Sequence, residues 1–135
     1  MKVFVYGTLR SGDCRFEVES FVEVIASEAH IEGFDMLDFG GFPGLIQGEN
    51  RIRGEVHEYE NLKILDRIEG YNERAPKTGL YNRCLVTAET PEGKIEDCWV
   101  YTFNKDEAHD YEEDIIKCGD WFEHRGYYEQ LELGS

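Results

Sequence analysis

A glutamate inside an apolar helical stripe is the strongest chemical signal in this sequence. The predicted helix covers Leu62 to Glu69. At about 100° per residue, Glu69 projects between Leu62 and Leu65, within the apolar arc. Burial disfavours a charged carboxylate and raises its pKa, and a glutamate shifted in this way can take up and return a proton near neutral pH. The pattern therefore predicts that Glu69 is a general acid/base.

A purely structural explanation of Glu69 carries about equal weight when the residues are considered alone. A glutamate at a helix end can bend to solvent or pair with an arginine, and the sequence offers Arg67, Arg74 and Arg83. Asp38 and Asp66 are weaker candidates for proton transfer, because an ordinary position on the protein surface would explain either of them.

A second chemical signal lies where a short apolar strand runs into the turn Tyr6-Gly7-Thr8-Leu9. Gly7 admits backbone angles that other residues resist, and it lets a ligand approach the main chain closely. Loops at the ends of buried strands often form small-molecule sites, so the N–H groups of this turn could hold an anion. Considered alone, the segment fits an ordinary turn better.

No metal or protein-nucleophile pattern accompanies these signals. The four cysteines are widely spaced and form no Cys-x-x-Cys pair, which does not fit a zinc site. A cysteine nucleophile needs a base and a lowered pKa, and the sequence indicates neither. The scattered histidines are expected to be surface or structural residues: His30, His57, His109 and His124. We therefore predict neither a metal nor a cofactor.

Composition limits the classes of partner. At 135 residues the chain is expected to form one domain, residues 1–135, with a core of its own. A net charge of −15 argues against nucleic acids and anionic membranes as partners. The sequence has no apolar run of membrane-spanning length and no signal-peptide pattern, which favours a cytoplasmic protein. A monomer is the simplest expectation for such an acidic domain.

The elements that must position these residues are mostly strands. Extended structure is predicted at the following places: Val3 to Val5, Val22 to Leu37 with a bend at Gly33, Arg53 to Tyr59, and a hairpin of Leu80 to Thr90 and Ile95 to Phe103 joined by Pro91 to Lys94. Phe39 to Leu45 is predicted to be a loop. The pattern indicates an α+β domain with a curved or barrel-like mixed sheet.

Two helices are predicted between and after these strands. Asn61 is a candidate cap for the first, and Gly70 ends it. Asn104, with Glu107 three residues later, resembles a capping box for a second helix that extends to about Ile116.

Taken together and in order, the motifs resemble those of the γ-glutamylcyclotransferase-like family, in particular its short avirulence-induced-gene and γ-glutamylamine cyclotransferase members. The resemblance extends from Met1 to about Trp121. The motifs that carry it are Tyr6-Gly7-Thr8-Leu9, Phe42-Pro43-Gly44-Leu45, Gly54-Glu55-Val56, Leu65-Asp66-Arg67-Ile68-Glu69-Gly70-Tyr71, Tyr81-Asn82-Arg83-Cys84-Leu85-Val86, Trp99-Val100-Tyr101 and Gly119-Asp120-Trp121.

The resemblance implies a compact cyclotransferase-like fold, a small mixed β-barrel flanked by short helices. It also implies that Glu69 is the catalytic residue. The substrate-binding residues that it implies are Tyr6, Gly7, Thr8, Leu9, Tyr81 and Arg83.

The implied reaction converts a γ-glutamyl amine, amide or peptide to 5-oxoproline and a free amine. The nucleophile is the substrate's own α-amine, which agrees with the lack of a protein nucleophile. Two alternatives remain: the same chemistry on another γ-glutamyl compound, and a non-catalytic small-carboxylate binding or protein-interaction module that retains the pocket. Glu69 separates these classes, because an enzyme needs its ionisation and a binding module does not.

Overall fold

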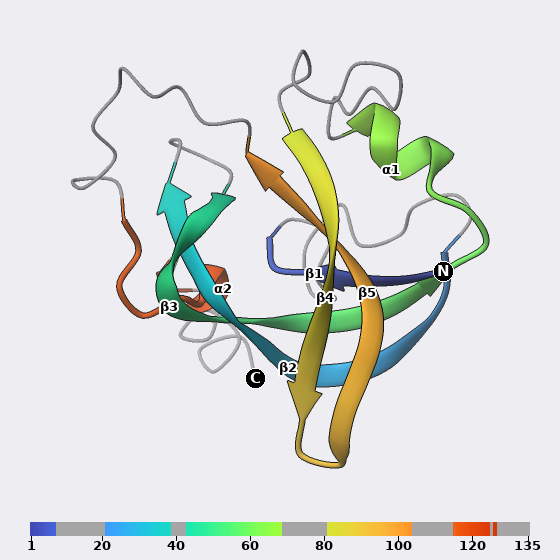
Figure 1. Ribbon diagram of the computed structural model, residues 1–135, viewed down its shortest axis with the longest axis horizontal. Coiled ribbons are helices and arrows are strands. Elements are labelled where there is room, and N and C mark those ends of the chain that lie inside the picture. Colours follow the sequence, from blue (N-terminus) through green and yellow to red (C-terminus); the bar gives the residue numbers. More distant parts are fainter. Residues whose placement is uncertain (8–20, 39–42, 69–80, 104–114, 125, 127–135) are drawn as a thin grey trace.

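The protein is described from a computed structural model, which defines residues 1–7, 21–38, 43–68, 81–103, 115–124 and 126 (Figure 1). The elements in this part of the chain are β1 (Lys2–Val5), β2 (Phe21–Asp38), β3 (Pro43–Tyr59), α1 (Lys63–Ile68), β4 (Tyr81–Thr90), β5 (Gly93–Phe103) and α2 (Trp121–His124).

The strands form a closed barrel in the order β1-β3-β2-β4-β5. Each pair of neighbours is antiparallel except β1 and β5, which run parallel where Val3 pairs with Trp99. That parallel contact closes the ring. The fold therefore confirms the predicted small mixed barrel with short flanking helices.

Most strand predictions are confirmed, including the bend in β2. Gly33 has a φ of 92°, and the register between β2 and β3 shifts from Glu32 to Phe34. Only a residue without Cβ adopts this angle readily, so the glycine allows the long strand to curl around the barrel. The hairpin of β4 and β5 is also confirmed, with a shorter turn than predicted because Gly93 and Lys94 already pair with Thr90 and Glu89.

The predicted loop from Phe39 to Leu45 is wrong in its second half. β3 begins at Pro43, and Leu45 pairs with Met36 of β2. Proline is tolerated at the first position of a strand because no preceding ladder bond needs its missing N–H. The burial of Leu45 then favours pairing over a loop; residues 39–42 lie outside the described part.

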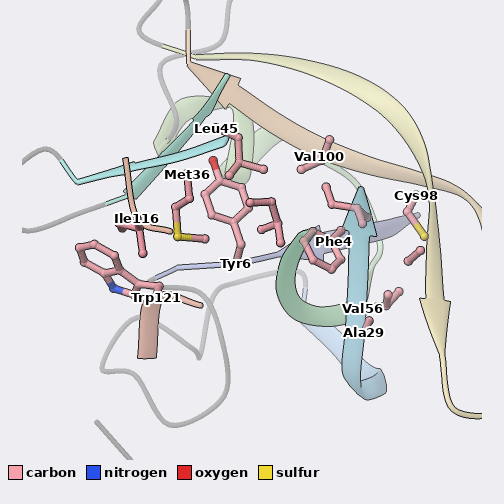
Figure 2. Close-up of a cluster of buried hydrophobic side chains, with 13 residues drawn as sticks. Phe4, Tyr6, Ala29, Met36, Leu45, Val56, Cys98, Val100, Ile116 and Trp121 are labelled. Atoms are coloured by element: carbon pink, nitrogen blue, oxygen red, sulfur yellow. The ribbon is translucent and has the colours of Figure 1, made fainter. Parts of the chain in front are cut away.

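The side chains of β1 alternate between two apolar clusters, as the pleat of a strand requires. Phe4 and Tyr6 belong to the cluster inside the barrel (Figure 2). Val3 and Val5 belong to a second cluster, which α1 covers from outside the barrel. The members of this α1 cluster are Val3, Val5, Tyr59, Leu62, Leu65, Tyr81 and Tyr101.

The structure confirms the predicted start and burial pattern of α1. The side-chain Oδ1 of Asn61 accepts a hydrogen bond from the backbone N–H of Lys63 at 3.1 Å, as an N-cap does. Leu62 and Leu65 are buried, whereas Lys63 is exposed. The described helix ends at Ile68, so Glu69 and Gly70 lie outside the described residues.

The predicted end of the second helix is wrong. Ile115 forms a β-bridge with Leu37, and the N–H of Ile116 donates to the carbonyl oxygen of Met36 at 2.7 Å. Pairing with the sheet buries Ile116 in the barrel cluster, and this outweighs the helical preference of the segment. Residues 104–114 lie outside the described part.

The sequence analysis did not predict α2, which follows this bridge. Asp120 is buried, its side-chain oxygen lies 3.4 Å from the N–H of Glu123 at the helix start, and it pairs with Arg53 at 3.6 Å. An aspartate before a four-residue helix is a weak signal, and the burial of Trp121 determines its place. Neither helix in the described part of the chain is long and apolar enough to span a membrane.

Gly119 fixes this C-terminal segment against β3 and gives a first testable prediction. Its φ is +66°, its carbonyl accepts from the N–H of Arg53, and an added Cβ would meet the backbone carbonyl of Arg51. Gly119→Ala should lower the free energy of unfolding by clearly more than the about 1–2 kcal/mol of left-handed backbone strain. Urea denaturation measures this.

The matched control for this prediction is Gly126→Ala. Gly126 has a φ of +73° with nothing within 4 Å of the added Cβ, so only the backbone strain applies. Equal losses for the two variants would contradict the packing argument.

Candidate functional site

The candidate site is built where β1 ends and where β3 and β4 begin. Gly7, which follows β1, packs against the ring of Pro43, and an added Cβ would lie 2.5 Å from its Cγ. The buried hydroxyl of Tyr81 donates to the carbonyl oxygen of Pro43 at 2.9 Å. Pro43 therefore brings together two residues that the resemblance implied, Gly7 and Tyr81, although they are far apart in sequence.

Tyr6 lies in the core, and its side chain faces the interior of the barrel (Figure 2). Its hydroxyl donates to the backbone carbonyl of Tyr101 at 2.7 Å, within the barrel. The ring therefore anchors the end of β1 to β5, and the chain leaves this anchor directly into Gly7. Thr8 and Leu9 lie outside the described residues, so their part in an anion cradle stays a prediction.

Arg83 of β4 lies against α1 and β5. Its Nη1 is 3.6 Å from Oδ2 of Asp66, and its guanidinium carbon is 4.7 Å from the centre of the Trp99 ring. The hydroxyl of Tyr101 donates to the other carboxylate oxygen of Asp66 at 2.6 Å. A guanidinium over an indole face is a favourable cation–π arrangement. These contacts form one cluster, the Asp66 cluster, of Asp66, Arg83, Trp99 and Tyr101.

The two aspartates that were expected at the surface are both partly buried and paired. Asp66 is 20% exposed and belongs to the Asp66 cluster. Asp38 is 26% exposed, and its carboxylate lies 2.7 Å from Nε2 of His124 on α2. Helical spacing alone could not reveal the partners of Asp66, because Arg83 and Tyr101 come from two other elements.

Sequence reasoning gave no role to a buried acid on β3. Glu55, in the Gly54-Glu55-Val56 motif, is 3% exposed and lies 2.9 Å from Nε2 of the fully buried His57. Glu55 pairs across the sheet with Val5, one residue before Tyr6. The available signal in the sequence was the alternation Glu55-Val56-His57, which places the two polar side chains on the same face of the strand. The pair matches the expectation that His57 is a structural histidine.

Glu69 itself lies outside the described residues. The described helix α1 leads to Ile68, the residue before it, and Leu62 and Leu65 confirm the apolar face on which the argument for Glu69 depends. The burial of its carboxylate and its role in proton transfer stay predictions.

One group of three described side chains has the spacing of metal ligands. Donor atoms of His30, Glu32 and Glu89 lie within 4.8 Å of one another. Each already has a partner: His30 meets Glu89 at 2.7 Å, Glu32 meets Arg51 at 3.2 Å, and Glu89 also meets Lys94 at 3.9 Å. Because two cations compete for the carboxylates, we interpret the group as an ion-pair network. It lies at the end of β4 opposite the candidate site.

Comparison with known proteins identifies the family of the chain. The family described as "Gamma-glutamyl cyclotransferase, AIG2-like" matches residues 3–123, which include every described element except the last residue of α2 and the first of β1. The chain belongs to this family. A relative from Niallia circulans, named gamma-L-glutamyl-butirosin B gamma-glutamyl cyclotransferase, is 32% identical over 128 residues, which cover 91% of this chain and 76% of that protein.

Solved structures share the cyclotransferase-like fold. YkqA from Bacillus subtilis has a TM-score of 0.68 and 24% identity, and the match covers 96% of this chain and 42% of that one. The protein ytfP from Escherichia coli has a TM-score of 0.60 and 25% identity, with 93% and 99% of the two chains covered. This chain thus corresponds to less than half of the Bacillus subtilis chain and to nearly all of the Escherichia coli one.

The buried tyrosine beside the Glu55–His57 pair gives a prediction about alkaline pH. Burial, reinforced by the Glu55 charge, raises the pKa of Tyr59 to about 12 from a usual 10.0. Because the folded state holds this proton more tightly than the unfolded state, the stabilisation is complete below pH 10 and is lost as pH rises towards 12. Two units correspond to about 2–3 kcal/mol.

Urea denaturation from pH 8 to pH 12, on wild type and Tyr59→Phe, measures this loss. Tyr59→Phe should flatten the alkaline decline relative to wild type. Parallel declines would show that Tyr59 ionises with an ordinary pKa in the folded protein.

Proposed function

We propose that this protein converts a γ-glutamyl amine, amide or peptide to 5-oxoproline and a free amine, with Glu69 as general acid/base. The observation that carries the proposal is the family match, because it extends over β1, the start of β3, α1 and the β4–β5 hairpin, the elements that build the candidate site. The name of the Niallia circulans relative gives a γ-glutamyl compound as that protein's substrate, and the same substrate class is proposed for this chain.

In the proposed reaction the nucleophile comes from the substrate. The carboxylate of Glu69 accepts a proton from the α-ammonium group, and the freed amine attacks the γ-carbonyl carbon. A new C–N bond closes the five-membered ring, the original amide C–N bond breaks, and Glu69 returns its proton to the departing nitrogen. Ring closure is intramolecular, so correct positioning of one molecule supplies much of the rate.

The cysteine of β5 does not have the character of an activated nucleophile. Cys98 is the fully buried cysteine of β5, and burial raises its pKa, which is opposite to the activation of a thiol. In the proposal the backbone N–H groups of Gly7, Thr8 and Leu9 hold the substrate carboxylate or the developing oxyanion. No metal or cofactor takes part in any step.

Tyr6, Tyr81 and Arg83 line the substrate side of the site in this proposal. Their described contacts give them a shared task, because each joins two elements: Tyr6 joins β1 to β5, Tyr81 joins β4 to β3, and Arg83 joins β4 to α1. Such cross-connections keep the turn after Tyr6 and the end of α1 in a fixed relation, as general acid/base catalysis requires.

Replacement of Glu69 by glutamine tests the proposed activity. Glu69→Gln should lower kcat at least about 100-fold, because glutamine cannot accept the ammonium proton. The wild type and variant are incubated with a panel of γ-glutamyl amines and dipeptides, and 5-oxoproline is measured by mass spectrometry.

Glu60→Gln is the matched control, since Glu60 is exposed in the segment that precedes α1, and its replacement should leave the rate unchanged. No 5-oxoproline from wild type on any compound, or equal rates for wild type and Glu69→Gln, would refute the assignment. Equal binding of 5-oxoproline by both proteins without turnover would instead indicate a small-carboxylate binding module.

Replacement of Gly7 tests the turn. The Cβ of Gly7→Ala would displace Pro43 and, with it, the carbonyl that Tyr81 holds. We expect KM to rise about tenfold, equal to about 1.4 kcal/mol of lost substrate binding. Steady-state kinetics measures it, and Gly93→Ala, in the distant hairpin where nothing lies within 4 Å, is the control. An unchanged KM in Gly7→Ala would argue against the cradle.

A further inference from the structure

Asp66 connects α1 to two strands by contacts on both of its carboxylate oxygens. Oδ1 accepts from the Tyr101 hydroxyl at 2.6 Å, and Oδ2 lies 3.6 Å from Nη1 of Arg83. Tyr101 belongs to β5 and Arg83 to β4, and the two residues are cross-strand partners. A single side chain of the helix is therefore held at two points of the same hairpin.

Tyr101 also anchors the other half of the candidate site. Its backbone carbonyl accepts from the hydroxyl of Tyr6, inside the barrel, while its own hydroxyl reaches Asp66 on the outside. The turn that begins after Tyr6 and the helix that leads to Glu69 are thus tied to the same residue of β5. Asp66 precedes Glu69 by three residues, which on a helix is about one turn.

The other described contacts of α1 with the barrel do not fix its rotation in the same way. Leu62 and Leu65 pack in the α1 cluster, and apolar contacts are non-directional. A hydrogen bond from a hydroxyl to a carboxylate is short, directional and strengthened by the charge. Among the described contacts of α1 with the barrel, those of Asp66 are therefore the directional ones, and they constrain how the helix is turned about its own axis.

We propose that Asp66 is a positioning residue, which through Tyr101 and Arg83 orients the last turn of α1 so that Glu69 faces the turn at Tyr6 to Leu9. The proposal rests on the proposed function. Arg83 then has two roles: it helps to orient Asp66, and it lines the substrate side of the site. Asp66 itself is not proposed to exchange a proton with the substrate, because Tyr101 and Arg83 already occupy both of its oxygens.

Two conservative variants test the proposal by kinetics. Tyr101→Phe removes only the hydroxyl and keeps the carbonyl that Tyr6 uses, and Asp66→Asn removes the charge that faces Arg83. Each should lower kcat about tenfold or more while KM stays within about twofold, since a misplaced general acid/base weakens the transition state and not substrate binding. Tyr59→Phe, which removes a buried hydroxyl from the same apolar cluster, should leave both constants unchanged.

The double variant adds a sharper criterion. If the two residues act as one unit, Tyr101→Phe combined with Asp66→Asn should be no slower than the slower single variant. A fall in kcat equal to the product of the two single effects would overturn the proposal. So would unchanged kcat in both single variants, or a raised KM with unchanged kcat, which would mean that the cluster contacts the substrate directly.

Hydrogen exchange followed by NMR gives a readout that needs no turnover. The backbone amides of residues 66–69 should exchange at least about tenfold faster in Tyr101→Phe than in wild type, because the last turn opens more easily without its anchor. Amides of the distant hairpin turn at residues 90–93 should be unchanged. If wild type forms no 5-oxoproline, the proposed function fails, whereas unchanged exchange at residues 66–69 overturns the role of Asp66.

Discussion

The structure depends on the burial of β1 on both of its faces. This four-residue strand pairs antiparallel with β3 and parallel with β5, and so closes the barrel. Phe4 fills the interior, while Val3 and Val5 contact the cluster beneath α1. A slip of one residue would put valine where Phe4 packs and phenylalanine where a valine packs, and close-packed clusters resist such a change of side-chain volume. The candidate site begins at the residue where this strand ends.

Hydrogen bonds of tyrosine side chains connect the strands of the barrel to the residues of the candidate site. Tyr6 and Tyr81 donate to backbone carbonyls of β5 and β3, and Tyr101 donates to a carboxylate of α1. Each ring supplies apolar area to a cluster, and each hydroxyl supplies one directed bond. The barrel thus gains stability and a fixed spacing of its site from the same residues.

The chain has 29 acidic and 14 basic residues, which makes the arrangement of the buried charges informative. Burial of a carboxylate costs free energy unless a partner compensates it, and three described buried or half-buried acids each have one. Glu55 has His57, Asp66 has Arg83, and Asp120 has Arg53. In each of these three pairs a nitrogen-bearing side chain lies within 4 Å of the acid.

Local patterns were sufficient where a single element sets the outcome. Two segments rich in β-branched and aromatic residues predicted the β4–β5 hairpin, Gly33 predicted the bend, and Asn61 with the apolar stripe that follows it predicted α1. They failed where pairing with another segment decides: Pro43 to Leu45 pairs with the end of β2, and Ile115 leaves the predicted helix to bridge Leu37. In both cases the burial of apolar side chains against another part of the chain outweighs a local preference.

The sequence by itself determined the barrel class, the family and the candidate residues of the site, because residue types, their order and their spacing can be read along the chain without a structure. Only the tertiary structure showed that Pro43 joins Gly7 to Tyr81, that Glu55 and His57 form a buried pair, and that Asp66 lies between Tyr101 and Arg83. Tyr101 and Asp66 are 35 positions apart in the sequence, and Tyr81 and Pro43 are 38 positions apart. Closure of the barrel brings them together, and no periodicity within a single segment encodes which side chain will lie opposite.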